Sequence, residues 1–214
     1  MARLMGKPTP AQLRALARRD PRLGEALLRV PAYPGYPDRG ERSRKTHFAA
    51  LARSIVYQQV AGAAARAILS RVVALTPGRE IPRPEELLDL GHDALRGAGL
   101  SRQKIASLTD LAERVCDGRL VLHCIGTRSD EEIVERLTSV RGIGEWTAQM
   151  FLMFRLGRLD VMPAGDLAVQ EGLRILDGSA ERPRPREVLA RTESWSPLRS
   201  VGAWVCWRLT DAKE

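Results

Sequence analysis

The chain has 214 residues, a formal net charge of +8 at pH 7 and a pI of about 10.1. Its hydrophobic content of 44% suits a folded protein with a sizeable core, in one domain or in two small ones. No apolar run approaches the ~18 residues of a membrane span, and the first residues lack the hydrophobic segment of a signal peptide. We therefore expect a cytoplasmic protein that has no membrane partner.

The positive charge makes a polyanion the first partner to consider. A basic surface that has no such partner explains the charge equally well. The three cysteines form no Cys-x-x-Cys pair and the three histidines are scattered, so neither a disulfide framework nor an iron–sulfur cluster is indicated. We predict that no metal takes part in the chemistry and that no cofactor is bound.

Apolar residues recur at helical spacing along nearly the whole chain, and strand-like alternation is almost absent. This pattern predicts an all-α protein. Thr9 and Ser129 are each followed three residues later by Gln or Glu, which is the spacing of a capping box and predicts that helices begin directly after them. Segments rich in proline and glycine at 31–37 and 178–185 are predicted connections. Further helices are expected at 21–30, 44–57, 61–75, 84–96, 102–117, 145–157, 167–176, 185–193 and 199–210.

The segment 137–148 is typical of a helix end, a tight turn and a new helix start. Gly142 and Gly144 permit positive φ and a close backbone approach, and Ile143 between them can anchor the turn in the core. Backbone N–H groups exposed at such a turn suit a phosphate. A loop that simply joins two helices gives the same Gly-x-Gly pattern, so the pattern alone leaves both interpretations open.

Beyond this hairpin, a Pro-Ala-Gly sequence at 163–165 interrupts the apolar pattern and is followed by Asp166. An Asp that directly precedes a helix starting at Leu167 is a good N-cap. A single fixed carboxylate can also act in chemistry. The two roles can coexist at one residue.

The order of these motifs resembles the helix-hairpin-helix DNA glycosylase superfamily, in which a hairpin is followed by a Gly/Pro-rich loop and a catalytic Asp. Here the turn at 141–144 leads to Asp166, and Trp146 lies twenty positions before that Asp. Within the superfamily the chain is most similar to the 3-methyladenine DNA glycosylase II family, over roughly residues 45–210.

This resemblance implies an all-α fold of two lobes with a DNA-binding cleft between them. One lobe, 47–158, would carry the hairpin, and the other, 1–46 plus 159–214, would carry Asp166. Longer bacterial members have an extra N-terminal β-containing domain. The 46 residues ahead of the matching lobe are too few to supply it, so we expect a compact form of the family.

The segment 53–61 is similar to the family segment that carries the wedge residue, which fills the gap left by a flipped nucleotide. Gln59 aligns with the wedge, and its neighbour Gln58 is the alternative. A side chain can fill the gap and also hydrogen-bond to the base that lost its partner. A solvated position on a helix is the plainer interpretation of Gln59.

Residues 195–200, with Trp204 and Trp207, are similar to the family's C-terminal helix. Trp146 and Trp207 match the tryptophans of the family's base pocket, and core packing is the plainer interpretation of both. Met150 stands where that pocket has an aromatic residue, which leaves the substrate range open.

The hairpin residues Arg141, Gly142, Ile143 and Gly144 would bind DNA phosphate, although a solubilising surface explains the arginine as well. The family also often binds a monovalent cation through main-chain carbonyl groups of the hairpin. The matching carbonyls in this chain are those of Thr138, Val140 and Ile143.

The resemblance implies that Asp166 stabilises the oxocarbenium-like transition state of N-glycosidic bond cleavage and orients or deprotonates the attacking water. The expected substrate is an N-alkylated purine, of the 3-methyladenine or 7-methylguanine class, flipped out of double-stranded DNA. Trp146 stands where lyase-active relatives have a nucleophilic Lys, so we expect a monofunctional hydrolase, acting as a monomer on nucleoid DNA. Two alternatives stay open: a glycosylase for another base lesion, and a non-catalytic helix-hairpin-helix DNA-binding module.

Overall fold

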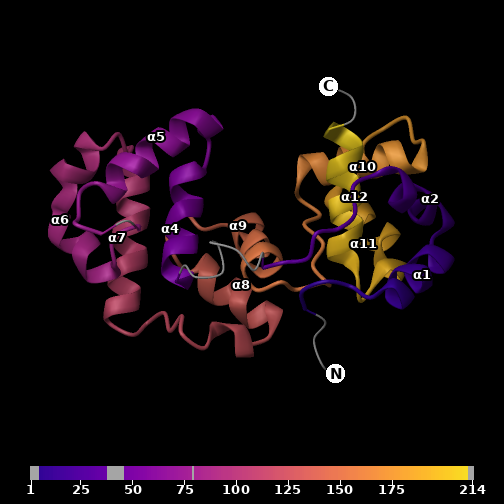
Figure 1. Cartoon of the computed structure of the whole chain (residues 1–214), viewed down its shortest axis with the longest axis horizontal. Coiled ribbons are helices and arrows are strands. Elements are labelled where there is room, and N and C mark those ends of the chain that lie inside the picture. The colour runs from indigo at the N-terminus through magenta and orange to yellow at the C-terminus, as the bar shows by residue number, and fades with distance from the viewer. Residues whose placement is uncertain (1–4, 38–45, 79, 212–214) are drawn as a thin grey trace. The chain divides into compact units, whose positions relative to one another are not determined.

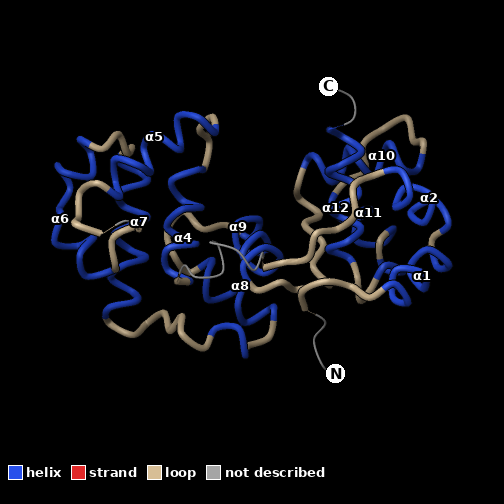
Figure 2. Tube along the Cα trace, viewed as in Figure 1, coloured by secondary structure: helices blue, strands red, loops and turns tan. Residues whose placement is uncertain are grey.

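The computed structural model describes residues 5–37, 46–78 and 80–211. Within these ranges the chain consists of helices joined by loops, and extended pairing is limited to two isolated bridges (Figure 1, Figure 2). The predicted all-α class is confirmed. The first two residues of the expected helix 44–57 and part of the expected segment 1–46 lie outside the described ranges. No helix in those ranges is long and apolar enough to cross a membrane.

The chain divides into two compact units. We call residues 44–151 the central unit, and residues 1–43 together with 152–214 the terminal unit. The limits expected from the sequence, at 46/47 and 158/159, fall three and seven residues later.

The central unit contains α4 (His47–Tyr57), α5 (Gly62–Val73), α6 (Pro84–Gly97), α7 (Arg102–Cys116), a 3-10 turn (Ile125–Thr127), α8 (Asp130–Thr138) and α9 (Glu145–Met150). α7 packs against both α6 and α4, and α8 packs against α9. Burial of aliphatic side chains stabilises this arrangement. The fully buried ones include Leu51, Ile55, Leu87, Leu95, Leu108, Leu111, Ile133 and Leu137.

The terminal unit contains α1 (Pro10–Arg19), α2 (Pro21–Arg29), α10 (Leu167–Asp177), α11 (Pro185–Arg191), a 3-10 turn (Glu193–Trp195) and α12 (Arg199–Asp211). α10 and α12 approach each other closely because α10 has Gly172 at their contact, where a Cβ would collide with the carbonyl group of Cys206. Trp195 is fully buried and lies against Gly202 of α12, where a Cβ would collide with the indole ring.

Two helix starts follow from local sequence signals, as predicted. The Thr9 hydroxyl accepts the Gln12 backbone N–H at 3.3 Å, and the Gln12 side chain accepts the Thr9 N–H at 2.7 Å. Ser129 and Glu132 make the same pair of bonds, at 3.0 and 2.8 Å. Each capping box satisfies two N–H groups, one of which the helix itself leaves without a partner, so the helix start is fixed.

The helix predicted at 145–157 is helical up to Arg155, but it is an α-helix only up to Met150. α9 ends there, and the next segment, Phe151–Arg155, is a π-helical turn. The residues of this turn are apolar up to Phe154, so hydrophobic spacing has no period that could show the change. The helix predicted at 185–193 likewise ends at Arg191 and gives way to the 3-10 turn.

A buried ionic network holds the terminal unit together. Asp20, the N-cap of α2, accepts the Leu23 N–H at 3.1 Å and hydrogen bonds of 2.6 Å from both Arg191 and Trp195. Arg191 also binds Asp177 at 2.8 and 2.9 Å. Burial by itself raises the pKa of Asp20, but the hydrogen bonds from Arg191 and Trp195 outweigh it and hold that pKa below its usual value. The network therefore joins α2, α10, α11 and the following turn.

Candidate active site and hairpin

The hairpin lies between Thr138, the last residue of α8, and Glu145, the first residue of α9. Ile143 is only 3% exposed and anchors the turn in the core, as predicted. Gly142 has φ +76, and a Cβ at this position would collide with the Ser107 hydroxyl of α7, so a side chain is excluded twice over.

Gly144 behaves differently from Gly142. Its φ is −90, which any residue can adopt, so this position does not use the positive φ that a glycine permits. Apart from Gly144 itself and its two chain neighbours, no described residue has an atom within 4 Å of the position where its Cβ would be. The backbone at the start of α9 is therefore open to an approaching molecule, and α9 has no side-chain cap within the part of the chain that the structure describes.

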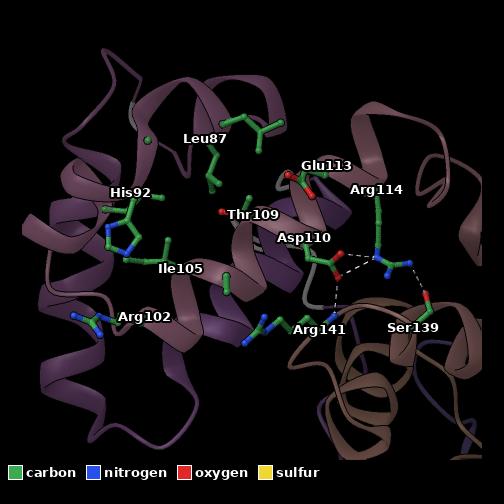
Figure 3. Close-up of a pocket in the computed structure, with 14 residues that line it drawn as sticks. Leu87, His92, Arg102, Ile105, Thr109, Asp110, Glu113, Arg114, Ser139 and Arg141 are labelled. Atoms are coloured by element: carbon green, nitrogen blue, oxygen red, sulfur yellow. Dashed lines mark hydrogen bonds and ion pairs between the residues drawn. The ribbon is translucent and has the colours of Figure 1, made fainter.

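Side chains of α7 hold the hairpin turn by hydrogen bonds. The Asp110 carboxylate accepts the Arg141 backbone N–H at 2.8 Å and the Arg114 guanidinium at 2.9 Å, and Arg114 reaches the Ser139 hydroxyl at 3.4 Å (Figure 3). Asp110 lies 31 residues before Arg141. Sequence reasoning missed this contact because no local pattern links the two positions.

A groove of about 630 Å³ lies between α6 and α7 and reaches the hairpin at Ser139 and Arg141 (Figure 3). Its lining includes the aliphatic side chains of Leu87, Leu88, Leu95 and Ile105, and neither Asp166 nor any tryptophan belongs to it. Of the predicted site residues, its lining includes Arg141.

Asp166 is half-buried and forms the N-cap of α10, as predicted. Its Oδ1 accepts the backbone N–H groups of Ala168 at 2.8 Å and Val169 at 3.0 Å. The preceding loop is anchored, because Pro163 is buried and its carbonyl accepts the Asp166 N–H at 3.0 Å. The carboxylate is thus held in one orientation by its own helix and loop.

Trp207 lies half-buried on α12, which packs against α10 in the terminal unit. Its ring stacks on Phe154, with centroids 5.7 Å apart and an interplanar angle of 28°. Phe154 in turn meets Tyr36 edge to face at 4.8 Å. Sequence reasoning missed Phe154 and Tyr36, since one follows from the π-helical turn and the other from a segment that looked like a plain connection.

The other two tryptophans near the C-terminus differ in role. Trp195 precedes α12, so the segment 195–200 is only partly the C-terminal helix, and its indole N–H binds Asp20 in the core. Trp204 donates its indole N–H to the carbonyl of Pro31 at 2.9 Å and meets Tyr33 edge to face. Trp195 is therefore a core residue.

Trp146 and Met150 belong to the central unit. Trp146 is 49% exposed near the start of α9, and Met150 is half-buried at its end. The two residues are four positions apart and so lie on the same face of the helix. The structure thus groups Trp146 with Met150, and Asp166 with Trp207, in separate units.

The two glutamines after α4 also lie in the central unit. α4 ends at Tyr57, so a position on a helix is wrong for Gln59. Gln59 is exposed and has φ +52, the one positive φ at a non-glycine residue in the described ranges. Gln58 is half-buried, and its side-chain amide donates to the Gly142 carbonyl at 2.9 Å and to the Thr147 hydroxyl at 3.4 Å.

Comparisons with known proteins agree on one family. The profile described as HhH-GPD superfamily base excision DNA repair protein matches residues 52–197. A Schizosaccharomyces pombe protein named DNA-3-methyladenine glycosylase 1 is 37% identical over 166 residues, covering 77% of this chain and 73% of the relative. The solved structure of S. pombe 3-methyladenine DNA glycosylase in complex with abasic DNA has a TM-score of 0.77 at 34% identity, covering 93% of this chain and 95% of that chain. The crystal structure of a DNA-3-methyladenine glycosidase from Bacillus halodurans has a TM-score of 0.80 at 32% identity, covering 100% of this chain and 95% of that chain.

Proposed function

We propose that this chain, which belongs to the HhH-GPD superfamily of base excision DNA repair proteins, is a monofunctional DNA glycosylase that removes N-alkylated purines from double-stranded DNA. The names of its relatives and the abasic DNA bound to one of them support this proposal. The single observation that carries it is Asp166, a carboxylate held rigidly at the start of α10 in the same unit as Trp207.

Asp166 acts on the sugar of the flipped nucleotide. As the base leaves, positive charge develops on the deoxyribose, and a fixed carboxylate beside it stabilises that charge and orients the attacking water. The two backbone hydrogen bonds to Oδ1 hold the group in place before the reaction, so little reorganisation is needed. A cationic alkylated purine is already a good leaving group, so the step requires no general acid.

Aromatic rings select the base. An alkylated purine is electron-poor and often cationic, so it is attracted to the face of an indole ring. Trp207 is kept in its orientation by stacking on Phe154, and Trp146 exposes half of its surface on α9. Met150 supplies an apolar and adaptable surface where an aromatic ring would be more selective.

The hairpin binds the DNA backbone. The exposed residues Gly142 and Gly144 supply backbone N–H groups that suit a phosphate oxygen, and the exposed Arg141 adds positive charge beside them. Gln59, exposed at the end of α4, is the wedge that fills the gap left by the flipped nucleotide.

The backbone carbonyl oxygens of the hairpin are suitable ligands for a monovalent cation. Thr138 is the last residue of α8, where helix carbonyls have no partner within the helix, and Val140 and Ile143 add two carbonyl groups from the same turn. These three carbonyls would hold the ion, which supplies positive charge toward a phosphate.

The enzyme hydrolyses the base without cutting the strand. A strand-cleaving glycosylase needs an amine that attacks the sugar and forms a Schiff base. Trp146 occupies the position where lyase-active relatives have that amine, and an indole nitrogen cannot form such an adduct. We place the protein in the cytoplasm as a monomer on nucleoid DNA, to which its net charge of +8 attracts it.

The test is an incubation of purified protein with methylated duplex DNA, with unmethylated duplex of the same sequence as the control. We expect free 3-methyladenine or 7-methylguanine, and strand breaks that appear only after alkali. Breaks before alkali would refute the monofunctional mechanism. Binding of the duplex with no base released would favour a non-catalytic module, and release of a different damaged base would correct the substrate.

A further inference from the structure

The turn that follows α4 has a strained backbone. Gln59 has φ +52, a region that residues with a Cβ rarely adopt because the Cβ approaches the following carbonyl oxygen. Glycine would occupy this position without that strain. Such a conformation persists at a non-glycine residue only where the surrounding structure enforces it, and these cases cluster at functional sites.

Two side-chain contacts hold the segment directly before Gln59. The Lys104 ammonium donates to the Val56 carbonyl at 2.6 Å and thereby fixes the last turn of α4. The Gln58 amide then donates to the Gly142 carbonyl at 2.9 Å and lies 3.4 Å from the Thr147 hydroxyl. Both contacts lie on the N-terminal side of Gln59, and they tie the end of α4 to two different parts of the central unit, α7 and the hairpin.

The other end of the Gln58 contact is itself held firmly. Ser107 packs against Gly142, and Asp110 binds the backbone of Arg141. Lys104, Ser107 and Asp110 follow one another at intervals of three residues and so lie along one stripe of α7. α7 is thus a common support for the end of α4 and for the hairpin, and Gln58 is the direct link between these two segments.

We propose that Gln58 is a positioning residue that locks the Gln59 turn to the DNA-binding hairpin, so that phosphate binding and insertion of Gln59 into the duplex act as one rigid step. This inference rests on the proposed function and assigns the two glutamines different tasks. Gln58 is half-buried with its amide directed at Gly142, so it does not enter the duplex. Gln59 is exposed and has a positive φ, which costs free energy at a residue with a Cβ.

The first experiment measures amide hydrogen exchange of the hairpin, residues 139–147, in the protein without DNA. Gln58→Met keeps the length of the side chain and removes its N–H donors. Gln103→Met makes the same change at an exposed glutamine of α7 and is the matched control. We expect faster exchange in the hairpin of Gln58→Met only. Equal exchange in wild type and Gln58→Met would overturn the link.

The second experiment is a double-mutant cycle on single-turnover base release from methylated duplex at saturating enzyme. We expect Gln58→Met and Gln59→Gly each to slow release about tenfold or more, with Gln59→Gly raising the unfolding temperature because it relieves the strain. The double variant should release base no more slowly than Gln59→Gly alone, since Gln58 acts through Gln59. Effects that multiply in the double variant would show that Gln58 acts independently and would overturn the proposal.

The two experiments separate this inference from the proposed function. If wild-type protein releases no base, the proposed function fails, and the hydrogen-exchange comparison still decides whether Gln58 links the turn to the hairpin. If wild type is active while Gln58→Met equals it in both rate and exchange, the proposed function stands and this inference falls.

Discussion

Gly142→Ala should be the most damaging small substitution in the hairpin. The alanine would have to adopt φ +76, which costs about 1–2 kcal/mol for a residue with a Cβ. Its Cβ would also overlap the Ser107 hydroxyl, which is tethered to the Gln103 carbonyl by a hydrogen bond of 2.9 Å and cannot easily turn away. Forcing an extra carbon into such a contact costs roughly 1–3 kcal/mol, so the total loss is about 2–5 kcal/mol.

Urea unfolding of four variants checks both parts of this estimate. In a Ser107→Ala background the hydroxyl is absent, so the steric part of the cost should disappear. The double variant should then be only about 1–2 kcal/mol less stable than Ser107→Ala alone, which is the backbone strain. Gly144→Ala is the control, because its φ is negative and its Cβ would meet no atom, and it should cost less than about 1 kcal/mol. Equal stability of the Gly142 and Gly144 variants, or no recovery in the double variant, would refute this reasoning.

Two further predictions concern the terminal unit. Because the folded-state pKa of Asp20 lies below its usual value, the stabilisation that its carboxylate gains from Arg191 is fully present above about pH 5 and declines as the pH falls below ~3.9. The unfolding free energies of wild type and Asp20→Asn in urea should therefore converge toward pH 3, and a difference between them that grows in acid would contradict this sign. Phe154→Leu removes the ring that stacks on Trp207, and such an aromatic pair is worth about 0.5–1.5 kcal/mol. We therefore expect kcat/KM for 7-methylguanine release to fall about 2- to 10-fold in this variant, while Phe154→Tyr stays close to wild type. A wild-type kcat/KM in Phe154→Leu would remove Phe154 from base recognition.

The features that could be predicted from the sequence depend on neighbouring residues. The caps at Thr9 and Ser129 bond to residues three positions away, and the Asp166 cap bonds to residues two and three positions away, so the same residue types at the same spacing predict them. The positive φ of Gly142 and the buried anchor Ile143 also follow from the turn itself.

The features that could not be predicted depend on residues far apart in the chain. Asp110 supports the hairpin from 31 residues away, and Gln58 reaches Gly142 across 84 residues. The direction of Phe154 depends on a π-helical turn that an apolar run does not reveal. Composition likewise gives no means of separating Trp195, a core residue bonded to Asp20, from a tryptophan that faces a ligand.

The central claim is that Asp166 is the catalytic carboxylate, and its most direct test is single-turnover base release by Asp166→Asn. Asparagine is as good an N-cap as aspartate, so the variant should keep α10 and its affinity for undamaged duplex while losing the negative charge. Asp93→Asn, at a fully exposed side chain, is the matched control and should equal wild type. We predict that Asp166→Asn releases 3-methyladenine at least about 10²-fold more slowly than wild type. Release at the wild-type rate from a correctly folded variant would contradict the assignment and remove Asp166 from the mechanism.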